Sequence, residues 1–141
     1  NLSLVKLGFS KLHEVSFSES KMIGIDWTRA SWSRMVFSSP IRFYQCILND
    51  SSFNGMSLPE LLLEDCKVHG VDFRDGNFQQ SKFCFSDFTG SLFSNTDLGE
   101  ADFCEATDYD IDVLNNRIKQ AKFSSFEAVR LLHGLDIELV D

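Results

Sequence analysis

The side chains best able to do chemistry in this 141-residue chain are three histidines and four cysteines. Cys66 and His69 are close enough in sequence to suggest a metal site, but the repeat described below points Cys66 inward and His69 outward, so their ligand atoms diverge. The sequence has no nucleophile elbow, phosphate-binding loop or HExxH zinc motif. We therefore expect no enzyme activity, no metal site and no cofactor.

The four cysteines form two pairs, each spaced by twenty residues: Cys46 with Cys66, and Cys84 with Cys104. We expect the first pair to point into the core and the second outward, with each pair stacked within disulfide reach. No disulfide-scaffold spacing is present, so we predict reduced thiols in a cytoplasmic protein. The alternative, a redox role for either pair, requires an unusual pKa at Cys84 and Cys104.

Charge is unevenly distributed along the chain. Residues 60–112 carry three basic and thirteen acidic residues, a net charge of −10, whereas residues 1–59 carry +2 and residues 113–141 carry 0. An acidic surface repels nucleic acid and anionic membranes and attracts a basic groove. No apolar run is long enough to span a membrane. We therefore predict a protein partner, with no direct binding to nucleic acid or to a membrane.

The sequence has a five-residue period, and the structure that this period specifies must position the histidines, cysteines and acidic residues. Bulky apolar residues recur at every fifth position from Leu7 to Phe37 and, after a slip of one residue at 38–40, from Phe43 to Phe103. This period fits neither a helix nor a strand. Twenty consecutive units result, and in fifteen of them the residue two positions before the apolar centre is small or short.

Two inward residues in each unit of five imply a chain that turns a corner after every unit. Four corners make a square coil of about twenty residues, and successive coils stack at about 4.8 Å. Each coil then buries its inward residues only against its neighbours, as in other repeat proteins. This geometry predicts that Phe73 lies between Phe53 and Phe93 in an aromatic ladder.

The segments GVDFR, SDFTG, TDLGE and ADFCE resemble the pentapeptide repeat family, whose usual unit is Ala-Asp/Asn-Leu/Phe-x-x. The resemblance covers residues 5–106 and implies an all-β solenoid, a right-handed quadrilateral β-helix of about five coils. Some members of this family mimic DNA, bind DNA gyrase or topoisomerase IV and protect them from quinolones or toxins. The present chain is shorter than those members, has a slightly basic N-terminal half and lacks a long projecting loop.

Acidic residues occur at two kinds of position in the repeat. Asp72, Asp87, Asp97 and Asp102 directly precede a centre, where the resemblance implies a structural role. Six others follow a centre, where the repeat does not demand acid, and we predict that they form an acidic partner-binding surface: Glu60, Glu64, Asp65, Asp75, Glu100 and Glu105. The leading hypothesis is a non-catalytic DNA mimic that binds a type II topoisomerase, and the alternative is a structural scaffold for another partner.

The repeat domain is predicted to span residues 1–107 and a C-terminal cap residues 108–141. Residues 108–120 are expected to leave the coil, and residues 121–123 to add one more unit. The first units start without an evident N-terminal cap. Either the native chain begins earlier, or another surface covers that end.

The cap is expected to contain an α-helix over about residues 125–133, with Ser124 and Glu127 as a capping box and Gly134 at C′. A short strand is expected over residues 136–141. The resemblance implies that such a helix covers the open coil and mediates a homodimer; the alternative is a simple cap against edge pairing. The residues predicted for the cap or dimer contact are Phe126, Val129, Leu131, Leu132, Leu135, Ile137 and Leu139.

Overall fold

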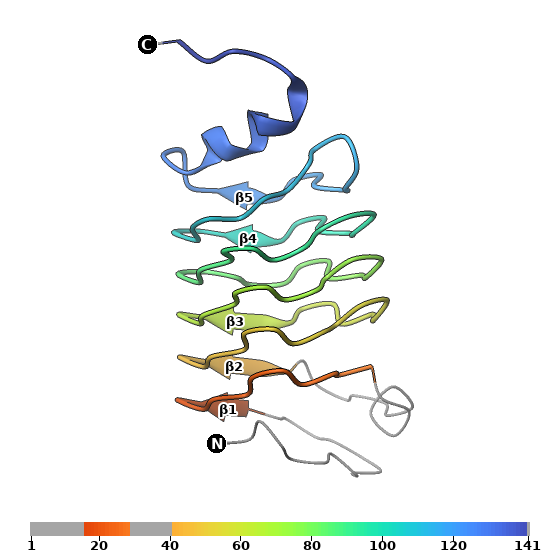
Figure 1. The fold of residues 1–141 in the computed structure, drawn as a ribbon, viewed down its shortest axis with the longest axis vertical. Helices are drawn as coiled ribbons and strands as arrows, with labels where there is room; N and C mark the ends of the chain where they lie inside the picture. Colours follow the sequence, from red (N-terminus) through yellow and green to blue (C-terminus); the bar gives the residue numbers. More distant parts are fainter. Residues whose placement is uncertain (1–15, 29–40, 141) are drawn as a thin grey trace.

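The computed structural model describes residues 16–28 and 41–140. They form a stack of coils with short parallel strands above one another on one face, which we call the strand wall (Figure 1). The strands are β1 (Ser16–Ser18), β2 (Arg42–Tyr44), β3 (Leu62–Glu64), β4 (Asp102–Phe103) and β5 (Lys122–Phe123). Lys82 bridges Leu62 and Asp102 in register, so the wall continues between β3 and β4. The predicted solenoid architecture is present.

The chain returns to the same place on each wall after twenty residues. Phe43 pairs with Leu63 on the strand wall, and the same offset separates the bridged pairs Ser52–Asp72 and Ser57–Asn77 on other walls. Backbone hydrogen bonds at 2.7–3.1 Å link successive coils around most of the circumference. These pairs confirm the predicted coil of twenty residues.

The first described coil is longer than the sequence pattern predicts. With one inserted residue, Met22 should face Phe43, an offset of 21, but the N–H of Met22 bonds the carbonyl of Ile47 and Phe17 pairs with Phe43, an offset of 26. The observed offset therefore exceeds the predicted one by five residues, one whole unit, and it is the same at Phe17–Phe43 and at Asp26–Ser52. The predicted slip at 38–40, like the units before Ser16, lies outside the described residues.

Large apolar side chains at the repeat centres fill the core. Phe73 stacks between Phe53 and Phe93, with ring centroids 5.6 and 5.0 Å away and interplanar angles of 6° on both sides. Trp27 extends the ladder by stacking on Phe53 at 5.7 Å. The predicted aromatic ladder is therefore confirmed. Its rungs stack because the side chains of residues twenty apart point inward at the spacing of paired strands.

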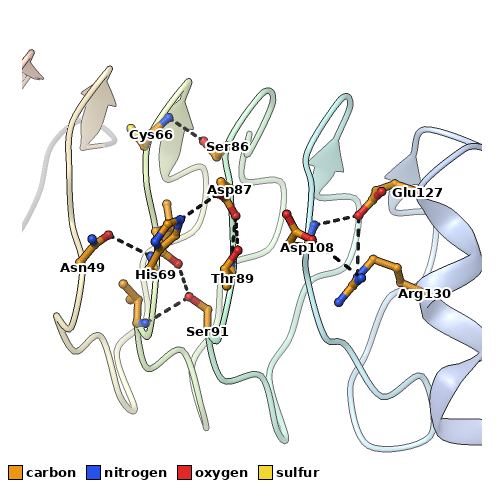
Figure 2. Close-up of polar contacts among 12 residues, drawn as sticks. Asn49, Cys66, His69, Ser86, Asp87, Thr89, Ser91, Asp108, Glu127 and Arg130 are labelled. Atoms are coloured by element: carbon orange, nitrogen blue, oxygen red, sulfur yellow. Dashed lines mark hydrogen bonds and ion pairs between the residues drawn. The ribbon is translucent and has the colours of Figure 1, made fainter.

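The small inward position often carries a residue whose buried hydroxyl forms hydrogen bonds with the backbone of the neighbouring coil. Ser91 Oγ accepts a hydrogen bond from the Val71 N–H at 3.1 Å and donates one to the Val68 carbonyl. Ser86 Oγ makes the equivalent pair, accepting from the Cys66 N–H at 3.1 Å (Figure 2) and donating to a carbonyl at 2.7 Å. Serine is therefore small enough for the interior and supplies bonds that buried backbone groups need.

Each unit ends in a tight turn whose last residue has a positive φ. These residues are mostly Gly, Asp, Asn, Glu or Gln, as at Gly70 (64°), Asp75 (60°) and Gln80 (60°). The left-handed conformation is free of steric cost for Gly and unfavourable for residues with a large side chain. Within residues 16–28 and 41–140, Phe85 at 61° is the one aromatic residue in this conformation.

The segment that leaves the regular coil, predicted over residues 108–120, is shorter in the structure. Arg117 bridges Asp97 at the usual offset of twenty, and the carbonyl of Asn115 accepts a bond from the Asn95 N–H at 2.8 Å. The coil register thus resumes at Asn115 rather than after residue 120. In the interrupted segment, Tyr109 fills the core where the regular centre would be residue 108.

The C-terminal helix differs from the prediction in type and bounds. The structure has a 3-10 helix, η1 (Ala128–Leu135), in place of an α-helix over 125–133, and its C-cap is Asp136 in the left-handed conformation rather than Gly134. Residues 136–140 form no strand. None of the helical residues described here belongs to a helix with the length and apolar character that a bilayer span requires.

The predicted capping box is wrong because both of its side chains bond the last coil instead. Ser124 Oγ accepts a hydrogen bond from the Glu105 N–H at 2.8 Å, and Glu127 Oε2 accepts one from the Asp108 N–H at 2.8 Å (Figure 2). The N-cap, Glu127, makes no side-chain capping bond to η1. The end of a solenoid presents a row of unpaired backbone groups, and these compete successfully for polar side chains.

Candidate functional site

The aspartates that precede repeat centres hold the turns of the coils. The Oδ1 atoms of Asp72, Asp87 and Asp97 each accept a hydrogen bond from the backbone N–H two residues later, at 2.9, 3.1 and 3.0 Å. Asp102 Oδ1 accepts the equivalent bond from the Cys104 N–H at 3.0 Å. These bonds support the structural role predicted for the four positions and separate them from the candidate binding surface.

Three of these aspartates also face a basic side chain, and His69–Asp87 is visible in Figure 2. The pairs are Asp72–Arg74 at 3.0 Å, Asp87–His69 at 2.8 Å and Asp97–Arg117 at 3.4 Å. Partial burial acts to raise the pKa of Asp72, but hydrogen bonds from Arg74 outweigh it and hold the pKa below its usual value. A lowered carboxyl pKa contributes stability at neutral pH that is lost as the pH falls through that value.

The six acids predicted to bind a partner are all exposed, and none forms an ion pair within the described segments. Three of them instead accept hydrogen bonds from amides twenty residues away. The bonds run from Gln45 to Asp65 at 3.4 Å, from Asn95 to Asp75 at 3.1 Å and from Gln80 to Glu100 at 2.9 Å. A neutral amide satisfies a carboxylate oxygen without cancelling its charge, so these surfaces stay negative.

Five of the six acids border the strand wall, and we call them the acidic rims. Glu60 and Glu100 lie at the turn before the wall, Glu64 is the last residue of β3 at the edge of the wall, and Asp65 and Glu105 lie at the turn after it. Acids in one column are two coils apart, which is about 10 Å. Asp75, the sixth predicted acid, belongs to another corner. The sequence predicted these residues individually, and the coil register brings five of them to one face.

A shallow groove of about 490 Å³ adjoins the acidic rims, lined by Tyr44, Gln45, Glu64, Asp65 and Phe85. Phe85 is 57% exposed and occupies the left-handed turn position that other coils give to polar residues or Gly. An aromatic ring beside two carboxylates matches a lysine or arginine side chain, through cation–π contact and charge pairing. Sequence reasoning missed Phe85, although a Phe in the turn position was a visible break in the repeat.

All four cysteines are free thiols, and their positions follow the prediction: Cys46 and Cys66 are buried, Cys84 is half-buried and Cys104 is exposed. Burial, followed by the nearby charges of Asp102 and Cys104, raises the pKa of Cys84 to about 11. A raised pKa makes this thiol a poor nucleophile, which argues against a redox role for it. The structure also brings Asp102 to these thiols, with the three ligand atoms all within 4.8 Å of one another.

Part of the predicted cap or dimer contact is left uncovered. Phe126 is 91% exposed, and Val129, Ile137 and Leu139 are each more than half exposed. The remaining predicted residues, Leu131, Leu132 and Leu135, are only partly accessible. Arg130 holds the cap to the preceding coil, donating from Nε to the Tyr109 carbonyl at 2.9 Å. Figure 1 shows η1 at the end of the stack beside β5.

These features define a class of protein, a β-solenoid built from five-residue units with polar left-handed corners. Residues 25–103, more than half of the chain, match the family described as "Pentapeptide repeat region". The chain belongs to the pentapeptide repeat family. A comparison with curated proteins finds no match.

Solved structures of similar proteins share little sequence with this chain. HetL, a pentapeptide repeat protein involved in heterocyst differentiation regulation from the cyanobacterium Nostoc sp. strain PCC 7120, is 12% identical over 79% of this chain and 71% of its own, with a TM-score of 0.43. Rfr23 from the cyanobacterium Cyanothece 51142 is 11% identical over 82% and 84%, with a TM-score of 0.36. Trypsin-treated QnrB1, a plasmid-mediated fluoroquinolone resistance protein, is 15% identical over 93% and 92%, with a TM-score of 0.29.

Proposed function

We propose that this protein is a non-catalytic binding protein whose acidic rims dock into a basic groove of a protein partner. The partner class that best fits such a surface is a type II topoisomerase, whose basic groove ordinarily receives duplex DNA. The observation that carries the proposal is the alignment of five acids along both edges of one wall, none of them in an ion pair with another described residue.

The charge density of the acidic segment supports a DNA-like surface. Residues 60–112 carry a net charge of −10. They span fewer than three coils, or about 12 Å of the stack. Duplex DNA carries one charge per about 1.7 Å of axis, so the two densities are comparable, although the protein distributes its charge around four walls. Such a field accelerates docking to a basic groove and weakens as salt screens it.

The groove beside Phe85 offers a specific contact in addition to this long-range electrostatic attraction. A basic side chain of the partner that entered it would meet the ring of Phe85 and the carboxylates of Glu64 and Asp65 together. Cation–π pairs of this kind contribute about 0.5–2 kcal/mol depending on desolvation. The groove therefore supports recognition of an arginine or lysine at one defined place on the wall.

Neutralising the acidic rims is expected to abolish the interaction with a topoisomerase. The variant replaces Glu60, Glu64 and Glu100 with Gln, Asp65 with Asn, and Glu105 with Gln, which keeps side-chain shape at the corners. We expect wild-type protein at micromolar concentration to inhibit DNA gyrase supercoiling or to relieve quinolone inhibition. The variant should be at least about tenfold weaker, since it loses the charges that steer and hold the complex.

The matched control removes the same amount of negative charge elsewhere, at Asp26, Asp50, Asp112, Asp136 and Glu138, which are all exposed. It should retain wild-type activity in the same assay. If both variants lost the same amount of activity, the effect would depend on net charge alone. That result would reject a defined acidic surface. Wild-type protein without inhibition, and without rescue from a quinolone, would reject topoisomerases as the partner class.

A second candidate function is a scaffold for a partner recognised mainly through aromatic contact, and the exposed Phe85 favours it. Binding of this kind should persist at high salt, because apolar contacts are not screened. Replacing Phe85 with Asn should then weaken capture more than neutralising the rims does. Both variants are tested for binding to the same partner. A larger loss of binding in Phe85→Asn favours the scaffold, and a larger loss in the neutralised variant favours the acidic surface.

We further propose that the protein forms a homodimer through the exposed apolar residues of the cap, Phe126, Val129, Ile137 and Leu139. Exposed apolar side chains gathered at one end of a stack favour self-association. Phe126→Asp should convert the dimer to a monomer, measured by light scattering coupled to gel filtration. Leu92→Asp, at an apolar residue that is 45% exposed outside the cap, serves as the control and should remain dimeric. A wild-type monomer at about 100 μM would contradict a dimer of useful affinity.

A further inference from the structure

Three potential metal-ligating groups converge on the strand wall. The Sγ atoms of Cys84 and Cys104 and a carboxylate oxygen of Asp102 all lie within 4.8 Å of one another. The twenty-residue register stacks the two cysteines one coil apart, and Asp102 precedes the same repeat centre that Cys104 follows. Among the described residues, this is the one group of three such side chains that lie this close together.

The carboxylate of Asp102 is already oriented for this role. Its Oδ1 accepts the N–H of Cys104 at 3.0 Å, which fixes the side chain beside the thiol. The equivalent aspartates Asp72, Asp87 and Asp97 each face a basic side chain. Asp102 forms no ion pair within residues 16–28 and 41–140, although Lys82 and Lys122 flank it in register. Among the described residues, it is the one member of the set without a basic side chain at ion-pair distance.

Stacking geometry favours a bridging ion over a disulfide. Residues in register on adjacent coils have parallel side chains about 4.8 Å apart, whereas a disulfide needs Cβ atoms about 3.8 Å apart and sulfurs about 2.05 Å apart. Two thiolates on one tetrahedral zinc, with Zn–S bonds of about 2.3 Å, are separated by nearly 4 Å. The coil spacing can accommodate that distance with side-chain rotation alone.

We propose that Cys84, Asp102 and Cys104 bind one Zn²⁺ ion through two thiolate sulfurs and one carboxylate oxygen, with solvent in the remaining position. Binding displaces the protons of both thiols into solvent, so the net charge of the occupied site equals that of the empty one. A bound divalent cation favours the deprotonated form of the thiols that ligate it.

Zinc titration of the reduced protein tests the site. We expect calorimetry in the presence of a phosphine reductant to give one Zn²⁺ per chain. Cys104→Ser and Asp102→Asn should each weaken binding at least about tenfold, because each removes a ligand or its charge. Asp102→Asn retains an oxygen for the turn, and Cys104 is exposed, so both variants should keep the wild-type circular dichroism spectrum. Asp87→Asn, the same change in an equivalent turn, should leave zinc affinity unchanged.

A second measurement follows the thiol itself. Saturating Zn²⁺ should slow alkylation of Cys104 by iodoacetamide at least about tenfold, as read by mass spectrometry, because a coordinated sulfur is a poorer nucleophile. A chelator should restore the rate. Zinc affinity that is unchanged in Cys104→Ser, or an alkylation rate of Cys104 that zinc leaves unaltered, would overturn the proposed site.

Discussion

Replacing Phe73 with alanine is expected to lower the free energy of unfolding by about 3–5 kcal/mol. Its ring is fully buried and stacks on Phe53 and Phe93 in the coils on either side. It also meets Phe78 edge to face at 5.3 Å. Alanine would leave a cavity at the junction of three coils, and the neighbouring rings are held by their own stacks and cannot close it.

Urea denaturation followed by far-ultraviolet circular dichroism measures this loss. The control is Phe85→Asn, which removes the same ring from an exposed corner with a φ of 61°. Asn tolerates the left-handed conformation, so this variant should match the wild type or exceed its stability by up to about 1 kcal/mol. A loss below about 1 kcal/mol for Phe73→Ala would mean that the ladder is not a rigid core.

Ser91→Ala is expected to destabilise the protein by about 1–3 kcal/mol, a large effect for the loss of one oxygen atom. The hydroxyl accepts the Val71 N–H at 3.1 Å and donates to the Val68 carbonyl. Both groups belong to the preceding coil and are enclosed by the core. Alanine has nearly the same volume, so the loss reports the two backbone groups left without partners rather than a cavity.

The repeat provides a control for this substitution at Ser81. Its hydroxyl is also buried, but it has no hydrogen-bond partner among the described residues. Ser81→Ala should therefore be neutral or raise stability by up to about 1 kcal/mol, because it removes an unsatisfied polar group. The two variants are compared by the same urea titrations. Equal losses at Ser91 and Ser81 would show that the hydroxyl bridge contributes nothing.

The regular part of the fold could be predicted from the sequence because every unit obeys the same local rule. The apolar centre and the small residue two positions earlier both point inward, and the chain must then turn. This rule predicted the ladder through Phe53, Phe73 and Phe93 and the separation of the thiols into an inner and an outer pair. It also set the structural aspartates apart from the other acids.

The irregular parts could not be read from the period. Phe17 pairs with Phe43 at an offset of 26, five residues more than the period with one inserted residue predicts. A five-residue period fixes the spacing within each unit but does not fix how many residues separate two paired coils. The position of Tyr109 in the core had no periodic signal either, because it lies one residue beyond the regular centre.

The cap was mispredicted because local and long-range partners compete for the same side chains. Ser124 and Glu127 have the spacing of a capping box, but they accept hydrogen bonds from the N–H groups of Glu105 and Asp108. Those donors lie about twenty residues away in sequence and one coil away in space. No local motif contains this information.

The sequence by itself determined the length of the regular coil, the identity of its core residues and the excess of negative charge in its middle. The tertiary structure decided which of those residues meet. Stacking brings five acids to the edges of one wall, places Phe85 beside two of them, and joins Asp102 to Cys84 and Cys104. The reason is that the inward pattern is set within each unit. A surface site instead combines positions up to 45 residues apart, and their register depends on every coil between them.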